Sequence, residues 1–131
     1  MHSNRSPISH SFHARCCQAA VLVAIAIPVF TNQFEKSREA TDAANIHSAY
    51  AEVVVIAIDD PNNSSNTKVV SIVQKDNGWK QSDIKTGLIK AFGGSNNVTN
   101  ISGVGSGKKA TIAWNKTTSS AEGHTNLIIG D

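Results

Sequence analysis

The pattern of apolar and polar residues divides the chain into one long helical segment and a second half broken by polar turns. Within residues 19–30 every residue except Pro28 is apolar, and residues 34–58 contain no glycine or proline. The second of these stretches is rich in alanine, glutamate, lysine and arginine, which favour a helix. We therefore predict one helix over 19–58, in which 31–58 forms an amphipathic half. Pro28 is expected to bend this helix without ending it.

One side of the amphipathic half carries apolar residues at spacings of three and four, the period of a buried helix face. We expect this stripe to face a sheet. Its members are Ala43, Ile46, Tyr50, Val53 and Ala57. The first turns of this half carry mixed charge and are expected to be solvated. These charged residues are Glu35, Lys36, Arg38, Glu39 and Asp42.

The second half of the chain predicts short strands and turns. The sequence Asp59-Asp60-Pro61 should end the helix, because proline restricts the residue before it. Alternating or β-branched runs predict strands at 68–74, 109–115 and 125–130, a short helix or turn at 82–92, and a loop at 95–108. The expected fold class is α+β, with a long N-terminal helix packed on a small antiparallel sheet.

The length of 131 residues fits a single domain. We predict a disordered or leader-like segment at 1–18, the helix at 19–58 and an α+β head at 59–131. There are 12 basic and 10 acidic residues, a net charge of +2, and the basic residues are scattered. No specific nucleic-acid partner is therefore predicted.

The residues that commonly carry chemistry are not grouped as a catalytic or metal site requires. Cys16 and Cys17 are adjacent and cannot form a disulfide framework, and the five histidines lack the spacing of metal ligands. The glycine-rich stretch 102–109 has Ser102 and Lys109 where a phosphate-binding loop needs glycine and Ser or Thr. We predict a protein that is not an enzyme and has no catalytic residue, cofactor or metal.

The stretch VLVAIAIPVFTNQFEKSREATDAANIHSAYAEVVV, from Val21 to Val55, closely resembles the N-terminal helix of type IV pilins and pilin-like, prepilin-type proteins. Its apolar block, its Ile-Pro-Val-Phe and its SREATDAAN segment carry the resemblance. In that family the apolar half-helix lies in the membrane before assembly and in the filament core afterwards, and a small antiparallel sheet packs on the amphipathic half. By position, Pro28 matches the family's kink-forming proline. The filament or membrane packing positions would be Val21, Leu22, Val23, Ile25, Ile27 and Phe30, and the sheet-facing positions are the stripe given above.

The resemblance implies a structural subunit of a type IV pilus-like surface filament that polymerises through its N-terminal helix. Its partners would be other pilin subunits, the inner or cytoplasmic membrane before assembly, and the pilus assembly machinery. The implied location is the membrane and the cell surface, with a single apolar N-terminal segment. Two alternatives remain: a pseudopilin of a secretion or DNA-uptake system, and a secreted or membrane-tethered binding module.

The chain departs from the family ahead of this helix. Family members have a basic leader that ends in glycine, where a dedicated peptidase cuts, and then a helix start whose glutamate pairs with a neighbouring subunit. The corresponding region here reads HSFHARCCQAA, without that glycine or glutamate. We therefore expect that this chain is not processed or polymerised in the family's usual way.

Overall fold

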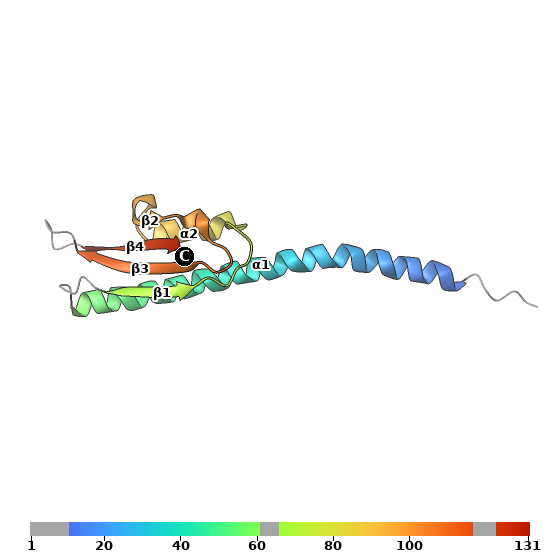
Figure 1. The fold of residues 1–131 in the computed structure, drawn as a ribbon, viewed down its shortest axis with the longest axis horizontal. Helices are drawn as coiled ribbons and strands as arrows, with labels where there is room; N and C mark the ends of the chain where they lie inside the picture. The colour runs from blue at the N-terminus through green and yellow to red at the C-terminus, as the bar shows by residue number, and fades with distance from the viewer. Residues whose placement is uncertain (1–10, 61–65, 117–122) are drawn as a thin grey trace, which may run out of the picture. The chain divides into compact units, whose positions relative to one another are not determined.

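A computed structural model describes residues 11–60, 66–116 and 123–131 (Figure 1). Within the long helix, side chains are described at Ala24 and from Ile27 onward. The chain forms two compact units, Met1–Phe34 and Glu35–Asp131.

The long helix, α1, spans Ser11–Asp59, and Pro28 lies inside it. It begins ahead of the expected start at residue 19, because residues 11–18 contain no glycine or proline to stop it. Its last turn closes with a hydrogen bond from the Asp60 N–H to the Ile56 carbonyl oxygen, at 2.8 Å. The end falls just before Pro61, as the sequence predicts.

The larger unit contains a four-stranded sheet in the order β1-β3-β4-β2. The strands are β1 (Thr67–Ser71), β2 (Val98–Thr99), β3 (Lys109–Lys116) and β4 (Gly123–Gly130). β3 pairs antiparallel with both β1 and β4, whereas β2 is parallel to β4. The α+β prediction is confirmed at the level of a long helix and a sheet. The sheet is mixed and not purely antiparallel, because β2 is parallel to β4. β2 lies within 95–108, the stretch that was expected to be a loop.

A second helix, α2, spans Ser82–Ala91, where the sequence indicated a short helix or turn. Two single turns of 3-10 helix follow it, η1 (Ser95–Asn97) and η2 (Ile101–Gly103), on either side of β2. Leu88 of α2 and the adjacent Phe92 are buried in the core of the unit.

The core lies between the second half of α1 and the sheet, which run side by side (Figure 1). Ile46, Val53 and Ala57 of the helix stripe are buried, while Ala43 and Tyr50 are half-buried. The Tyr50 ring meets the Phe92 ring edge-on, with ring centroids 4.9 Å apart. Across the core lie the buried side chains of Ala110 and Ile112 from β3 and of Leu127 and Ile129 from β4.

The location expected from the sequence is corrected where it places a single apolar N-terminal segment in the membrane. Among the residues that the structure describes, no helix is long and apolar enough to cross a membrane. The physical reason is that the apolar run in 19–30 falls short of the roughly 20 residues needed, and Glu35 and Lys36 follow it closely.

Candidate assembly surface

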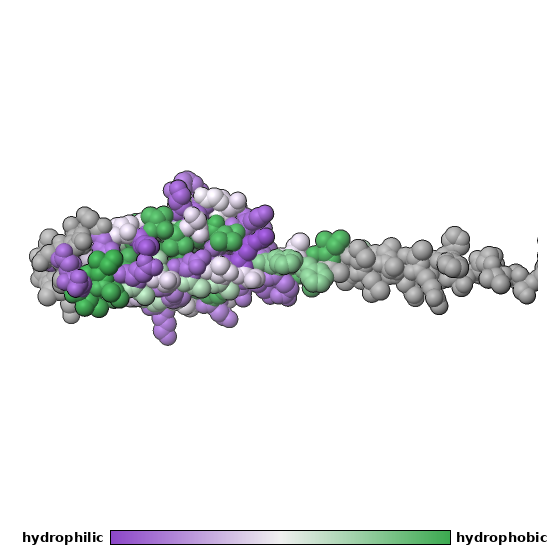
Figure 2. Space-filling view, turned by 90° about the horizontal axis from the view of Figure 1, so that it is seen from below, coloured by the Kyte–Doolittle hydropathy of each residue, from purple (hydrophilic) through white to green (hydrophobic). Residues whose placement is uncertain are grey.

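The smaller unit exposes large apolar side chains on α1. Ile27, Val29, Phe30 and Phe34 are 59%, 55%, 61% and 62% exposed. No residue from Ile27 to Phe34 is charged. Within this stretch, the Thr31 hydroxyl donates a hydrogen bond to the Pro28 carbonyl oxygen at 3.0 Å. Figure 2 shows green, hydrophobic surface on this stretch of the helix. Ile27, Phe30 and Phe34 are spaced three and four residues apart and so share one side of α1, and an exposed apolar stripe of this kind is typical of an interaction site.

Two of the packing positions implied by the sequence, Ile27 and Phe30, belong to this surface. The other four, Val21, Leu22, Val23 and Ile25, lie in α1, but their side chains fall outside those that the structure describes. The sequence interpretation left out Val29 and Phe34. Phe34 lies one turn after Phe30, so extending the apolar spacing across the boundary between the two halves would have found it.

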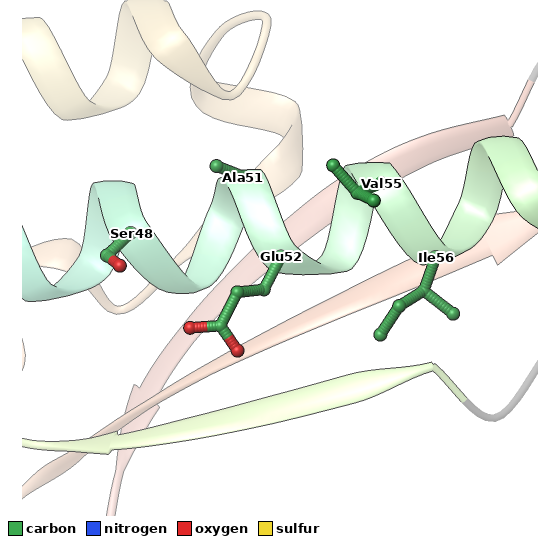
Figure 3. Close-up of a pocket in the computed structure, with 5 residues that line it drawn as sticks. All are labelled: Ser48, Ala51, Glu52, Val55 and Ile56. Atoms are coloured by element: carbon green, nitrogen blue, oxygen red, sulfur yellow. The ribbon is translucent and has the colours of Figure 1, made fainter.

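The larger unit has a shallow hollow on the exposed side of α1 (Figure 3). It is lined by Ser48, Ala51, Glu52, Val55 and Ile56, all of them exposed. In Figure 3, Ala51 and Val55 lie along one edge of the helix, and Glu52 and Ile56 point toward β1. The lining is apolar apart from Ser48 and Glu52, and Ile58, one turn beyond Val55, is 75% exposed.

The charged start of the amphipathic half is solvated only in part: Lys36 is exposed and Arg38 is half-buried, but the three acidic residues are buried. Glu35, Glu39 and Asp42 are only 3%, 0% and 0% exposed. Their spacing of four and three places them on one side of α1, in line with the buried stripe that begins at Ile46. We call these three residues the carboxylate row, and residues 72–81, which lie against them, the strap.

The carboxylate row binds the backbone of the strap. Asp42 accepts hydrogen bonds from the N–H groups of Val73 and Gln74, at 2.7 and 2.9 Å. Glu39 accepts from Lys80 and Gln81, at 2.7 and 2.9 Å. Each carboxylate therefore holds two successive amides of a segment that has left the sheet.

Glu35 holds the middle of the strap in the same way. Its Oε1 accepts from the N–H groups of Lys75 and Asp76 at 2.6 and 2.8 Å, and its Oε2 accepts from the Arg38 guanidinium at 2.8 Å. Every oxygen of the three carboxylates thus has a hydrogen-bond donor. Carboxylates buried and satisfied in this way are suited to fixing the backbone and not to acid-base chemistry.

The environments of Glu35 and Asp42 shift their pKa values in opposite directions. Burial raises the pKa of Glu35, but the Asp76 and Lys75 N–H groups and the Arg38 guanidinium outweigh it, so the pKa lies below the ordinary value. Burial raises the pKa of Asp42 as well, and the nearby charges of Glu35 and Glu39 add to the effect. The two strap amides do not overcome it, and the pKa of Asp42 lies above its ordinary value.

Sequence reasoning missed the carboxylate row because its binding partners are far away in the chain. The hydrogen-bonded residues are separated by 31 to 42 positions. The one available signal was that all three acids continue the spacing of the apolar stripe. Among the described residues, no group of three or more His, Cys, Asp or Glu side chains is placed to hold a metal ion.

Comparisons with known proteins do not assign the chain to a family. No protein-family model, no curated protein and no solved structure matches the chain.

Proposed function

We propose that this protein is a pilin-like filament subunit, a non-enzymatic structural protein that assembles with its own copies through α1. The observation that carries the proposal is the uncharged surface of Ile27, Val29, Phe30 and Phe34, each more than half exposed. The resemblance of residues 21–55 to the pilin helix supports the same assignment. A filament subunit needs an apolar helix face that is exposed to solvent in the single subunit and becomes buried when copies meet.

The size of the apolar surface favours repeated contacts over one isolated pair. Burying a large apolar side chain contributes about 1.5–3 kcal/mol. Four such side chains together therefore offer an amount similar to the roughly 4–15 kcal/mol that association costs. A filament subunit adds contacts with further neighbours while losing its translational and rotational freedom only once, so additional contacts can exceed this cost.

The test is sedimentation velocity on the purified full chain at increasing concentration. The wild type is expected to form large, concentration-dependent assemblies. Replacing Phe30 and Phe34 with serine should weaken assembly by roughly a hundredfold or more, because two large apolar side chains no longer become buried. Circular dichroism checks that the helix and sheet content is unchanged.

The matched control replaces two equally apolar, exposed residues of the sheet, Val69 and Ile128, with serine. Assembly of this control is expected to stay within a few-fold of the wild type. A wild type that remains monomeric at every concentration would overturn the proposal and favour a monomeric binding module. Equal loss in both double variants would show that general surface hydrophobicity, and not α1, drives association.

A further inference from the structure

A cavity of about 280 Å³ opens beside the core, at the start of β4. Three aromatic side chains line it: Tyr50 of α1, Phe92 just after α2, and Trp114 of β3. A concave site with a mostly apolar lining and a few polar groups is typical of ligand binding. Its other lining residues are Val54, Gly93, Asn97, Gly123, His124 and Thr125.

The cavity meets the edge of β4 and not only one of its faces. Gly123, His124 and Thr125 are consecutive residues of this strand. Successive residues of a strand point to opposite faces of the sheet. A hollow that all three residues line therefore runs along the main chain of β4.

Gly123 and Thr125 direct their main-chain N–H and C=O groups toward this edge. β3 uses its even-numbered residues for hydrogen bonds to β1, as the bond from the Trp114 N–H to the Asn66 carbonyl oxygen shows. The alternation of an antiparallel ladder leaves the odd-numbered residues of β3 to bond with β4. These residues lie opposite the even-numbered residues of β4, such as His124, so the odd-numbered residues of β4 point away from β3.

β2 covers the same edge further along and stops short of Thr125. It pairs with Leu127 and Ile128 alone. Ahead of β2, η1 turns the chain away, because the Asn97 N–H bonds to the Gly94 carbonyl oxygen at 3.2 Å and not to β4. Among the described residues, no strand pairs with Thr125 on this side. The cavity, lined by both Asn97 and Thr125, lies where a longer β2 would run.

Trp114 has an unpaired polar group at the same place. Its indole N–H is buried and has no hydrogen-bond partner, which is uncommon for tryptophan. The ring lies against Gly123, since a Cβ built there would be 2.5 Å from Cε2, the atom bonded to the indole nitrogen. The unpaired donor therefore lies close to the open edge of β4, and the described residues supply no acceptor for it.

We propose that this edge and cavity bind an extended peptide as an added strand, with one large apolar side chain in the cavity. Main-chain hydrogen bonds to an exposed sheet edge give such complexes their affinity, and pockets for alternate side chains give them their specificity. Thr125 supplies the edge N–H and C=O groups, and its own side chain is buried on the core face. The ligand residue opposite Thr125 points to the same face, toward the three aromatic rings.

The groups around the cavity favour a peptide over a charged ligand. None of the nine lining residues is Lys, Arg, Asp or Glu, so a charged ligand finds no opposite charge there. An extended peptide offers N–H and C=O groups in the alternation that an open strand edge requires. This binding site goes beyond filament assembly and does not depend on it.

The test is binding of the uncharged peptide acetyl-Ser-Thr-Phe-Thr-Ser-amide to the purified full chain. Saturation-transfer NMR observed on the peptide measures the dissociation constant whether the chain is monomeric or assembled. We expect saturable binding at roughly 0.1–1 mM, because a short strand and one side chain must offset the ordering of the peptide. Replacing the peptide's phenylalanine with alanine should weaken binding roughly tenfold or more.

Two N-methylated peptides test strand addition separately from insertion of the side chain. Only alternate N–H groups of an added strand face β4. A methyl group on the phenylalanine nitrogen and one on the nitrogen of the following threonine should therefore have unequal effects, differing by roughly tenfold. Loss with the first peptide indicates an antiparallel added strand, and loss with the second indicates a parallel one. Equal dissociation constants would overturn the proposal.

A pair of protein variants tests whether the peptide lies in this cavity. Val54→Phe adds bulk to the cavity lining and should weaken binding roughly tenfold or more. Val55→Phe, at the next residue of α1 and outside this lining, should leave binding within a few-fold of the wild type. Circular dichroism checks that both variants keep their helix and sheet content. Variants that bind alike, or a wild type that does not bind at about 10 mM peptide, would contradict the proposal.

Discussion

At the scale of single residues, Glu39 shows how a charged side chain becomes part of a protein core. Its side chain is fully buried, which is costly for a carboxylate unless hydrogen bonds replace its water. The N–H groups of Lys80 and Gln81, the two residues just before α2, replace that water. The N-cap residue of α2, Gln81, makes no side-chain cap of its own, and Glu39 instead places a negative charge beside the N-terminal end of this helix.

We predict that Glu39→Gln lowers the free energy of unfolding by about 2–4 kcal/mol. Glutamine keeps the volume, but its NH2 group faces one of the two N–H donors and leaves it unpaired. Urea unfolding at neutral pH measures the change. The control is Glu52→Gln, at an exposed carboxylate that pairs with Lys68 and is expected to contribute less than about 1 kcal/mol. Equal effects of the two substitutions would contradict a structural role for the buried carboxylate.

The pH dependence of stability should carry a signature of Glu35. Its native pKa is lowered, so its stabilising contribution to the free energy of unfolding is fully present above the unfolded pKa of about 4.3. It is lost as the pH falls through the lower native value. Asp42, whose native pKa is raised, acts in the opposite sense: its contribution is full below its unfolded pKa and is lost as the pH rises through its native pKa.

The measurement compares wild type and Glu35→Gln by urea unfolding at a series of pH values from neutral to acid. The wild type should be more stable at neutral pH, and the gap should shrink as the pH falls below about 4.3. A gap that stays constant or widens on acidification would be inconsistent with a hydrogen-bonded, ionised Glu35.

At the scale of elements, the strap explains why β1 is shorter than its sequence suggests. The β-branched run 68–74 predicts a strand, yet β1 ends at Ser71. The next residue, Ile72, still donates to the Lys108 carbonyl oxygen at 2.9 Å. From Val73 onward the N–H groups turn to the carboxylate row instead. Tertiary hydrogen bonds therefore override local strand propensity here.

The hairpin of β3 and β4 depends on a glycine at the end where Lys116 pairs with Gly123. A Cβ atom built at Gly123 would lie 2.1 Å from Cζ2 of Trp114. We predict that Gly123→Ala displaces the indole and destabilises the protein by about 1–3 kcal/mol. Thermal unfolding and tryptophan fluorescence measure this effect.

Gly130→Ala in the same strand is the control. A Cβ there meets none of the described neighbouring atoms within 4 Å, so its effect on stability should be small. Similar destabilisation by both substitutions would mean that the strand backbone, and not the Trp114 contact, requires glycine.

At the scale of the whole molecule, the features predicted from the sequence are the helix and strands that have a local pattern of apolar residues. The long helix and the strands that became β1, β3 and β4 follow from spacing and composition. β2 was missed because it has two residues and exists only through parallel pairing with β4. The carboxylate row was missed because acidic residues on a helix are ordinarily exposed, and only the folded position of the strap makes their burial favourable.

Assembly of copies of this protein through the apolar side of α1 can be seen directly by electron cryo-microscopy of assemblies formed by the purified full chain. We expect filaments in which Ile27, Phe30 and Phe34 are buried between helices of neighbouring copies. Filaments held together by the sheet with Phe30 left in solvent, or a chain that forms no filaments, would contradict it.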